Sequence, residues 1–155
     1  MTTAQQAFAQ TPLYTDEARY LLIQLPPRAI MAAAGVLAEI GTPFSALIAD
    51  KDEVTLVLPQ QDWEFFAARL PDHRIGGEYR LITFDLPLGL DMIGFMELIS
   101  RVLAEAGIPL MAFSAFARDH LLIGVDHFDA AWTALKNAQA HPGPTTANQP
   151  TSPII

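Results

Sequence analysis

Val36–Ala46 reads VLAEIGTPFSA, and a closely similar pattern, VLAEAGIPLMA, returns at Val102–Ala112. Further segments match on both sides and in the same order: Tyr20–Pro26 with Tyr79–Pro87, and Trp63–Leu70 with Asp129–Leu135. A single short match can arise by chance, whereas several matches in one order indicate an internal repeat. We therefore interpret the chain as two copies of one unit of about 60 residues.

The repeat predicts four segments along the 155 residues. They are an N-terminal segment, 1–18, that could add a strand, a first unit over 19–76, a second unit over 77–140, and a tail over 141–155. The tail contains four prolines and no Lys, Arg, Asp or Glu. Because it offers few backbone donors and little to bury, we predict that it is disordered.

Hydrophobic periodicity predicts the elements of the second unit. Alternating residues predict a strand at Arg80–Leu86, and apolar residues at helical spacing predict a helix from Met92, capped by Asp91, to Ala106. Two more strands and a second helix complete this unit: Leu110–Phe116, His120–Val125, and a helix opened by Asp126 or His127. We expect the Asp126 carboxylate to cap that second helix.

The order strand, helix, strand, strand, helix lacks only a fourth strand to complete a ferredoxin-like unit. In the first copy, His73–Ile75 could supply it before a turn at Gly76-Gly77; in the second, the N-terminal segment could fill the edge. We predict an α+β fold of two ferredoxin-like βαββα(β) units side by side, with an antiparallel sheet and helices on one face.

Composition limits the classes of function. The net charge of −8 disfavours binding to nucleic acid, because a negative field repels phosphate groups. The chain has no cysteine, which excludes disulfides, Cys-ligated zinc and thiol nucleophiles. No apolar run approaches the roughly 20 residues that cross a bilayer, and the N-terminus does not resemble a signal peptide. We expect a cytoplasmic protein that does not associate with membranes.

Two Asp-His pairs, Asp119-His120 and Asp126-His127, bracket one predicted strand. Seven steps along a strand separate them by about 23 Å, whereas metal ligands lie about 2.0–2.2 Å from one ion. We therefore predict no shared metal site. In a ferredoxin-like unit, Asp119 lies at the same end as the loop Pro87–Asp91, whose Gly89 and following helix start could receive a carboxylate. From the residues alone, Asp119 either holds the ammonium group of a zwitterion or only satisfies its own hairpin.

The second copy resembles an ACT domain. The resemblance rests on Gly94 before the helix, on LAEAGIPL at Leu103–Leu110 and on SAFARDHLLIG at Ser114–Gly124. It extends to the small bacterial tandem-ACT proteins and to the ACT units of cytosolic arginine sensors and aspartate kinase regulatory regions. ACT units are regulatory modules that pair side by side and hold a small ligand, often an amino acid, at the seam.

The resemblance implies ligand contacts in the loop after the first strand and at the hairpin of the second copy. The residues are Gly89, Asp91, Ser114, Ala115, Phe116 and Asp119. Ala115 departs from the family pattern because a threonine hydroxyl is usual there, and Arg118 could close over Asp119 as an ion pair. The first copy has a short loop without glycine, Pro26–Arg28, so we expect it either not to bind or to supply only a wall of the site.

We therefore predict a non-enzymatic, amino-acid-sensing tandem ACT protein that needs no cofactor. We expect it to form a homodimer and to act through that oligomer or through a protein partner. The alternative is an interaction protein with a degenerate pocket. An enzyme using Asp119-His120 is disfavoured because neighbouring strand residues face opposite ways. Ala29–Ile40 is almost wholly apolar, so we expect this helix to pack between the units or in the homodimer.

Overall fold

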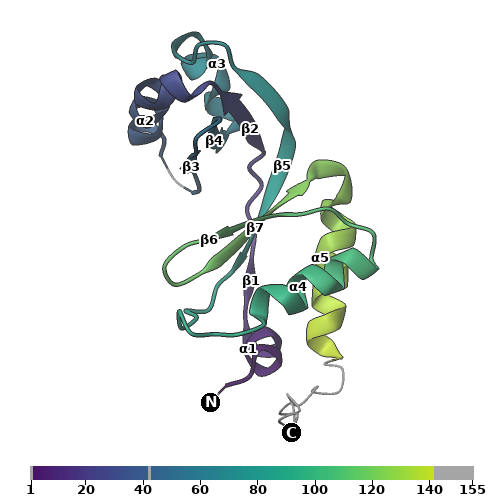
Figure 1. Cartoon of the computed structure of the whole chain (residues 1–155). Coiled ribbons are helices and arrows are strands. Elements are labelled where there is room, and N and C mark those ends of the chain that lie inside the picture. The colour runs from purple at the N-terminus through teal and green to yellow at the C-terminus, as the bar shows by residue number, and fades with distance from the viewer. Residues whose placement is uncertain (1, 42, 142–155) are drawn as a thin grey trace, which may run out of the picture.

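The computed structural model describes residues 2–41 and 43–141, so the tail predicted at 141–155 lies, except for His141, outside the described residues. The chain forms two lobes joined at a narrow waist, each with helices packed on its part of the sheet (Figure 1). We call the lobe that contains β2–β4 unit 1 and the lobe that contains β6 and β7 unit 2.

From Tyr20 onward the described elements follow the predicted order, and an unpredicted helix precedes them. They are α1 (Ala4–Gln10), β1 (Leu13–Tyr14), β2 (Tyr20–Leu25), α2 (Ile30–Glu39), β3 (Ala46–Ala49), β4 (Val54–Pro59), α3 (Trp63–Phe66), β5 (Arg74–Phe84), α4 (Phe95–Glu105), β6 (Met111–Ser114), β7 (Asp119–Gly124) and α5 (Phe128–Ala140). Short 3-10 helices η1 (Pro27–Ala29), η2 (Gln60–Asp62), η3 (Ala67–Arg69) and η4 (Val125–His127) adjoin α2, α3 and α5.

Within the described residues, the strands form one seven-stranded sheet in the order β3-β4-β2-β5-β7-β6, with β1 pairing beside β5. Every pairing is antiparallel. Each unit has the strand arrangement of a ferredoxin-like fold, with two helices against one face of its strands. The predicted fold class is therefore confirmed.

Strand β5 belongs to both units. The turn predicted at Gly76-Gly77 is wrong, because β5 runs without interruption from Arg74 to Phe84. Its first half pairs with β2 and its second half with β7. The register slips by one residue opposite Leu22 and Ile23, and Gly77 has a φ of 150°. The two glycines thus form an irregularity that bends a continuous strand, and not a connection between two strands.

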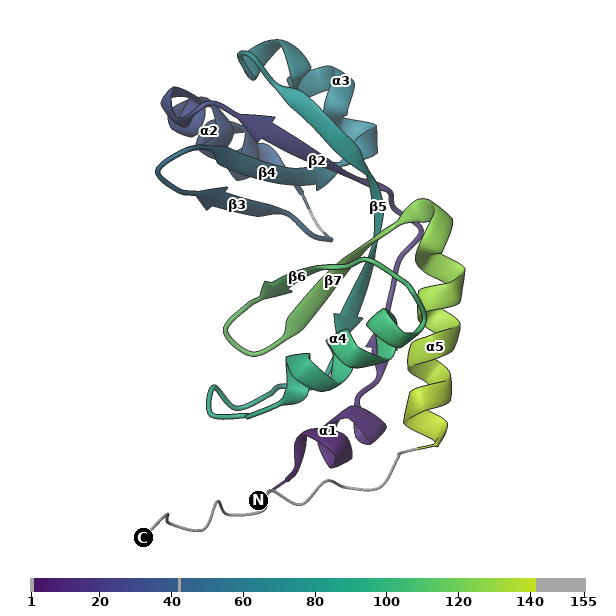
Figure 2. The same cartoon turned by 45° about the vertical axis from the view of Figure 1, so that its right-hand side comes forward.

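The N-terminal segment contributes to unit 2 and not to unit 1. Leu13 and Tyr14 of β1 pair with Phe84 and Thr83 of β5, at the edge where a fourth strand of unit 2 belongs. The chain then continues into β2, so β1 and β2 follow β5 along both lobes (Figure 2). The Gln139 amide of α5 holds this segment by donating hydrogen bonds to the carbonyls of Phe8 (2.8 Å) and Thr11 (2.7 Å).

Three apolar clusters hold the sheet. Unit 1 buries one cluster between its helices and strands, and unit 2 buries another that includes Phe8 of α1. The third lies on the opposite face of the sheet, at the waist, where Tyr20, Val57, Leu81 and Leu122 are buried together. Phe44, which precedes β3, reaches unit 2 and lies 5.0 Å from the His120 ring centroid. The two lobes are therefore in direct contact through this third cluster.

Two predicted helix caps are wrong. Helix α4 begins at Phe95 after Gly94, which has a φ of 84°, and not at Met92 after Asp91. Glycine adopts this left-handed backbone without the strain that a Cβ would add. Asp126 makes no capping hydrogen bond, because the turn Val125–His127 separates it from the start of α5.

Helix α2 does not pack between the two units. Its buried residues, Ala33 and Val36, face the core of unit 1, whereas Met31 is 80% exposed. The predicted position between the units is therefore wrong, and packing in a homodimer stays a prediction.

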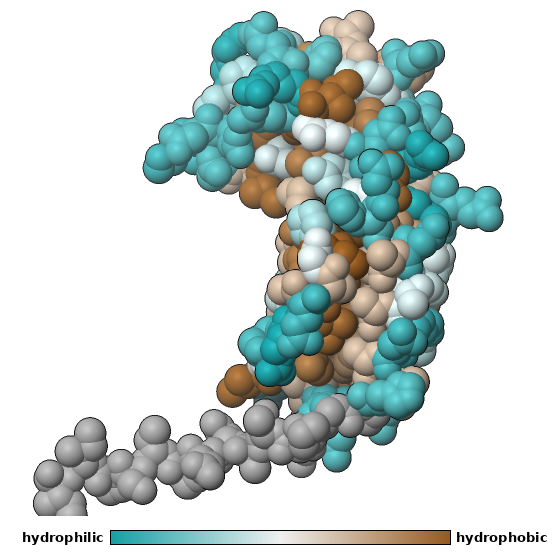
Figure 3. Space-filling view, turned by 90° about the vertical axis from the view of Figure 1, so that its right-hand side faces the viewer, coloured by the Kyte–Doolittle hydropathy of each residue, from teal (hydrophilic) through white to brown (hydrophobic). Residues whose placement is uncertain are grey.

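From the side shown in Figure 3, hydrophilic residues cover much of both lobes and hydrophobic residues show in separate areas between them. Within residues 2–41 and 43–141, no helix has the length and hydropathy needed to span a bilayer.

The packing of α1 gives a first prediction. Phe8 is 2% exposed, and its ring lies against the rings of Phe84 and Phe95. Replacing it by alanine removes these contacts and leaves a cavity, so Phe8→Ala should lower the free energy of unfolding by about 3–5 kcal/mol. Denaturant unfolding measures this loss, and the exposed neighbour Gln10→Ala serves as control. Equal stability of the two variants would show that the N-terminal segment is not docked.

Candidate functional site

The loop between β5 and α4 lies against the hairpin between β6 and β7. The backbone N–H of Leu88 donates a hydrogen bond to the carbonyl of Ala117 (2.9 Å). The Arg118 guanidinium Nε donates to the Asp85 carboxylate (2.8 Å). Both views of the fold show the two segments side by side (Figures 1 and 2). The structure thus brings the two predicted groups of site residues to one end of unit 2.

The six predicted residues occupy this end with different exposure. Asp119 is half-buried and is the first residue of β7, and the other five are exposed: Gly89, Asp91, Ser114, Ala115 and Phe116. Ser114 is the direct strand partner of Asp119. Their role in binding stays a prediction.

Gly89 has a steric reason to be glycine. The backbone N–H of Met92 donates to the Gly89 carbonyl (3.0 Å), which closes a tight turn. A Cβ at Gly89 would lie 2.6 Å from the Asp91 carboxylate oxygen Oδ1. The turn therefore places the Asp91 carboxylate against the backbone of Gly89, and any side chain at position 89 would have to displace this carboxylate.

Asp119 has no side-chain hydrogen bond or ion pair within the described part of the chain. The hairpin is closed by the backbone alone, because the Ala115 N–H donates to the Arg118 carbonyl (2.9 Å). The sequence allowed Arg118 to close over Asp119, but its guanidinium pairs with Asp85 on the neighbouring loop. That part of the prediction is wrong, because the docked loop offers Arg118 a carboxylate that the sequence does not place nearby. Among the described residues, the Asp119 carboxylate therefore stays without a charged partner.

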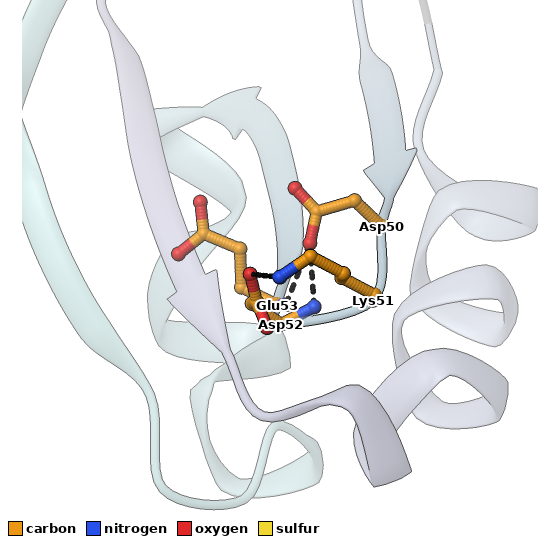
Figure 4. Close-up of polar contacts among 4 residues, drawn as sticks. All are labelled: Asp50, Lys51, Asp52 and Glu53. Atoms are coloured by element: carbon orange, nitrogen blue, oxygen red, sulfur yellow. Dashed lines mark hydrogen bonds and ion pairs between the residues drawn. The ribbon is translucent and has the colours of Figure 1, made fainter.

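The equivalent hairpin of unit 1 uses its own carboxylates. Asp50 accepts hydrogen bonds from the backbone N–H groups of Asp52 (2.7 Å) and Glu53 (2.9 Å), as Figure 4 shows. These two bonds hold the pKa of the Asp50 carboxyl below its ordinary value. Lys51 pairs with Asp52, and the Gln24 amide donates to Glu53. The carboxylates of this hairpin are thus engaged within the unit, unlike Asp119.

Large apolar side chains stand exposed at the same end of unit 2. Leu90 is 77% exposed, Ile93 89% and Phe116 82%. Sequence reasoning selected Phe116 and missed Leu90 and Ile93. The available signal was that both are large apolar residues in a loop ahead of a helix. Exposed apolar groups gathered at one place commonly mark a binding surface.

Two hollows of about 320 Å³ and 210 Å³ lie near the waist, away from the predicted site residues. The first is lined by two short stretches, Glu17–Arg19 and Pro59–Gln61, and the second by residues of β5 and β7 with Pro109 and Leu110. Neither includes any of the six predicted residues. Within the described residues, no group of three or more His, Cys, Asp or Glu side chains lies together as a metal site.

His120 belongs to the waist and not to the loop–hairpin end. The His120 Nδ1 and the Thr83 hydroxyl are 2.9 Å apart and form a hydrogen bond. Leu121, on one side of β7, lies in the core of unit 2, whereas Leu122 lies in the waist cluster, so alternation places Asp119 and His120 on opposite faces. Burial lowers the pKa of His120, Asp119 opposes this shift and Arg118 adds to it.

Comparison with known proteins identifies the class of module in unit 2. Residues 74–137 match the family described as ACT domain. The match begins at the first residue of β5 and ends within α5, so the chain contains an ACT domain and the predicted resemblance is confirmed there. Unit 1 repeats the same strand arrangement, but the match does not extend to it.

Solved structures share the fold over both units. The regulatory subunit of aspartate kinase from Thermus thermophilus, in its ligand-free form, has a TM-score of 0.67 at 13% identity, over 84% of this chain and 98% of that chain. A protein from Agrobacterium tumefaciens has 0.64 at 25% identity, over 82% and 87%. A Vibrio cholerae protein of unknown function, described as a possible transport protein, has 0.62 at 18% identity, over 85% and 93%.

The contrast between the two hairpins predicts different effects of two substitutions. Asp50→Ala removes the acceptor of two backbone hydrogen bonds and should lower the melting temperature, whereas Asp50→Asn keeps one acceptor oxygen and should lower it less. Asp119→Ala removes no such contact and should change the free energy of unfolding by less than about 0.5 kcal/mol. Thermal unfolding of the three variants checks this. A larger loss for Asp119→Ala than for Asp50→Ala would show that Asp119 supports its own hairpin.

The environment of His120 predicts a pH dependence of stability. Because its pKa in the folded chain lies below the ordinary 6.5, the unfolded chain binds the proton more readily. The stability that the folded chain gains from neutral His120 is therefore complete above pH 6.5. It is lost as the pH falls towards the lower pKa of the folded chain. The free energy of unfolding should fall less between pH 7.5 and pH 5.5 in His120→Gln than in the natural chain. An equal loss in both would contradict the prediction.

Proposed function

We propose that this protein is a regulatory module that binds a free amino acid at the loop–hairpin end of unit 2. The observation that carries the proposal is the docked pair of segments, in which Asp119 keeps a carboxylate without a partner among the described residues. The ACT domain at residues 74–137 supports a regulatory role that involves a small ligand.

The charges at this end favour a ligand with an ammonium group. Arg118 pairs with Asp85, so in the described part of the chain Asp91 and Asp119 are the carboxylates at this end without an ion pair. An ammonium group placed between a loop carboxylate and a strand carboxylate gains charge-assisted hydrogen bonds from both. In this proposal Asp119 is the principal contact, because it is half-buried and its attraction is screened less by water than that of exposed Asp91.

In this proposal, the carboxylate of the ligand binds at the start of α4. This helix begins after Gly94, and its first backbone N–H groups have no acceptor within the helix. They carry the positive end of the helix dipole, which suits an anion. Leu90, Ile93 and Phe116 would then contact the side chain of the amino acid or cover it together with a partner surface.

A thermal-shift screen with the twenty amino acids tests the proposal. A ligand at 100 times its Kd stabilises the folded state by about 2.7 kcal/mol, which raises the Tm by roughly 5–10 °C at this size. Asp119→Ala should abolish the shift, because it removes the carboxylate that holds the ammonium group. Asp126→Ala should keep it, since this exposed carboxylate lies at the opposite end of β7. Loss of the shift in both variants would refute the assigned position.

A second candidate function is that of an interaction protein without a ligand. The exposed Leu90, Ile93 and Phe116 favour it, because they offer an apolar surface even when no small molecule is bound. Under this alternative no amino acid shifts the Tm, and mass spectrometry of the purified protein finds no co-purifying small molecule. In that case Ile93→Asp should abolish capture of the partner protein while leaving the Tm unchanged.

A further inference from the structure

Strand β7 ends at a glycine that its backbone does not require. Gly124 has a φ of −51° and a ψ of 139°, which any residue can adopt. A Cβ at this position would lie 3.8 Å from His127 Cδ2, an ordinary contact, and, its chain neighbours aside, would meet no other atom of the described residues within 4 Å. Glycine weakens a strand, and there it often marks a place that a ligand or another backbone approaches closely. Neither the backbone nor the packing of the described chain explains this glycine.

Gly124 lies between two ring-shaped side chains on the neighbouring strands. On one side, Tyr79 of β5 is its direct strand partner. On the other side, Met111 of β6 pairs with Leu122. This register, carried two residues further, places Pro109 opposite Gly124. Because neighbouring strands are about 4.8 Å apart, the missing side chain leaves a gap one strand wide between the two rings.

A second glycine widens this gap. A Cβ at Gly77 would lie 3.3 Å from the Tyr79 ring, so the ring lies across bare backbone. The hollow of about 210 Å³ is lined by both glycines and both rings, and by Glu78, Leu110 and Leu122. Tyr79 and Leu122 also belong to the waist cluster, so the hollow adjoins the contact between the two units.

The lining of the hollow holds one charged side chain, and its charge is already paired. Glu78 accepts a hydrogen bond from the Gln60 amide at Oε1 (2.9 Å) and pairs with the Arg19 guanidinium through Oε2 (3.0 Å). Apart from Glu78 and the Tyr79 hydroxyl, the lining consists of apolar side chains and glycine backbone. An ion would lose its water there without gaining an unpaired opposite charge among the lining residues. The hollow therefore suits an uncharged molecule.

We propose that this hollow is a second binding site, for an uncharged molecule of one or two flat rings. Its volume of about 210 Å³ is that of roughly seven water molecules at about 30 Å³ each. This is below the roughly 300–1,000 Å³ of sites for drug-sized ligands. A flat ring enters the gap left by Gly124 and stacks on the Tyr79 ring. It contacts β5 at Gly77, where this strand bends between the units. The site is separate from the loop–hairpin end and does not depend on the function proposed for it.

NMR titration of the full chain, labelled with ¹⁵N, tests the proposal with indole as the probe. Indole should shift the backbone amide signals of Gly77 and Gly124 with a Kd of about 1 mM or tighter. Gly124→Leu should raise this Kd at least tenfold, because the new side chain fills the gap. Gly41→Leu is the matched control, since a Cβ at this exposed glycine of unit 1 meets no atom of the described residues within 4 Å. It should leave the Kd unchanged.

A charged relative of the probe tests the chemistry of the lining. Indole-3-acetate adds a carboxylate to the same ring system and should bind at least tenfold more weakly than indole, because the hollow offers this charge no free partner. Asp119→Ala should leave the Kd of indole unchanged, which separates this site from the proposed amino-acid site. Equal affinity for indole and indole-3-acetate would refute the assigned ligand class.

Thermal unfolding decides whether Gly124 is structural. Because its backbone accepts a side chain, Gly124→Leu should lower the Tm by no more than about 2 °C. A larger loss would show that the fold itself requires this glycine and would contradict the proposal. Two NMR results would also overturn it: no shifts at concentrations of indole up to roughly ten times the expected Kd, or shifts confined to the residues around Leu90, Ile93 and Phe116.

Discussion

The structure depends on the pairing of one long strand, β5, with the interrupted strand formed by β1 and β2. β5 ends unit 1 and begins unit 2, and the β1–β2 segment ends unit 2 and begins unit 1. Neither unit has four strands without its share of this pairing. The waist cluster around Tyr20 and Leu81 is packed on the same strands. Cutting the chain between the units would therefore remove an edge strand from one of them.

The two units share one topology, but they differ in the loop and the hairpin at one end. In unit 1 the segment between β2 and α2 is short and the hairpin engages Asp50. Unit 2 has a longer loop that docks on a hairpin whose Asp119 has no partner among the described residues. Because the framework strands carry the stability, the loop and hairpin of unit 2 could change without loss of the fold.

Periodicity predicted most of the strands and helices, because burial of one face leaves a pattern of two or 3.6 residues in the sequence. It also placed Gly89 and Asp119 at one end of unit 2. It did not predict the continuity of β5, since a Gly-Gly pair serves a turn and a strand bulge equally well. It did not predict the Arg118–Asp85 pair either, because that pair requires the loop to dock on the hairpin.

The sequence by itself determined the repeat and the order of elements, because these follow from local patterns, and the resemblance to an ACT domain supplied the residues of the candidate site. Only the tertiary structure decided which strands the units share, that the N-terminal segment completes unit 2, and that Arg118 leaves Asp119 without a partner among the described residues. These outcomes depend on competition between groups that lie far apart along the chain. Such competition is settled by which surfaces are buried together, and no local pattern records it.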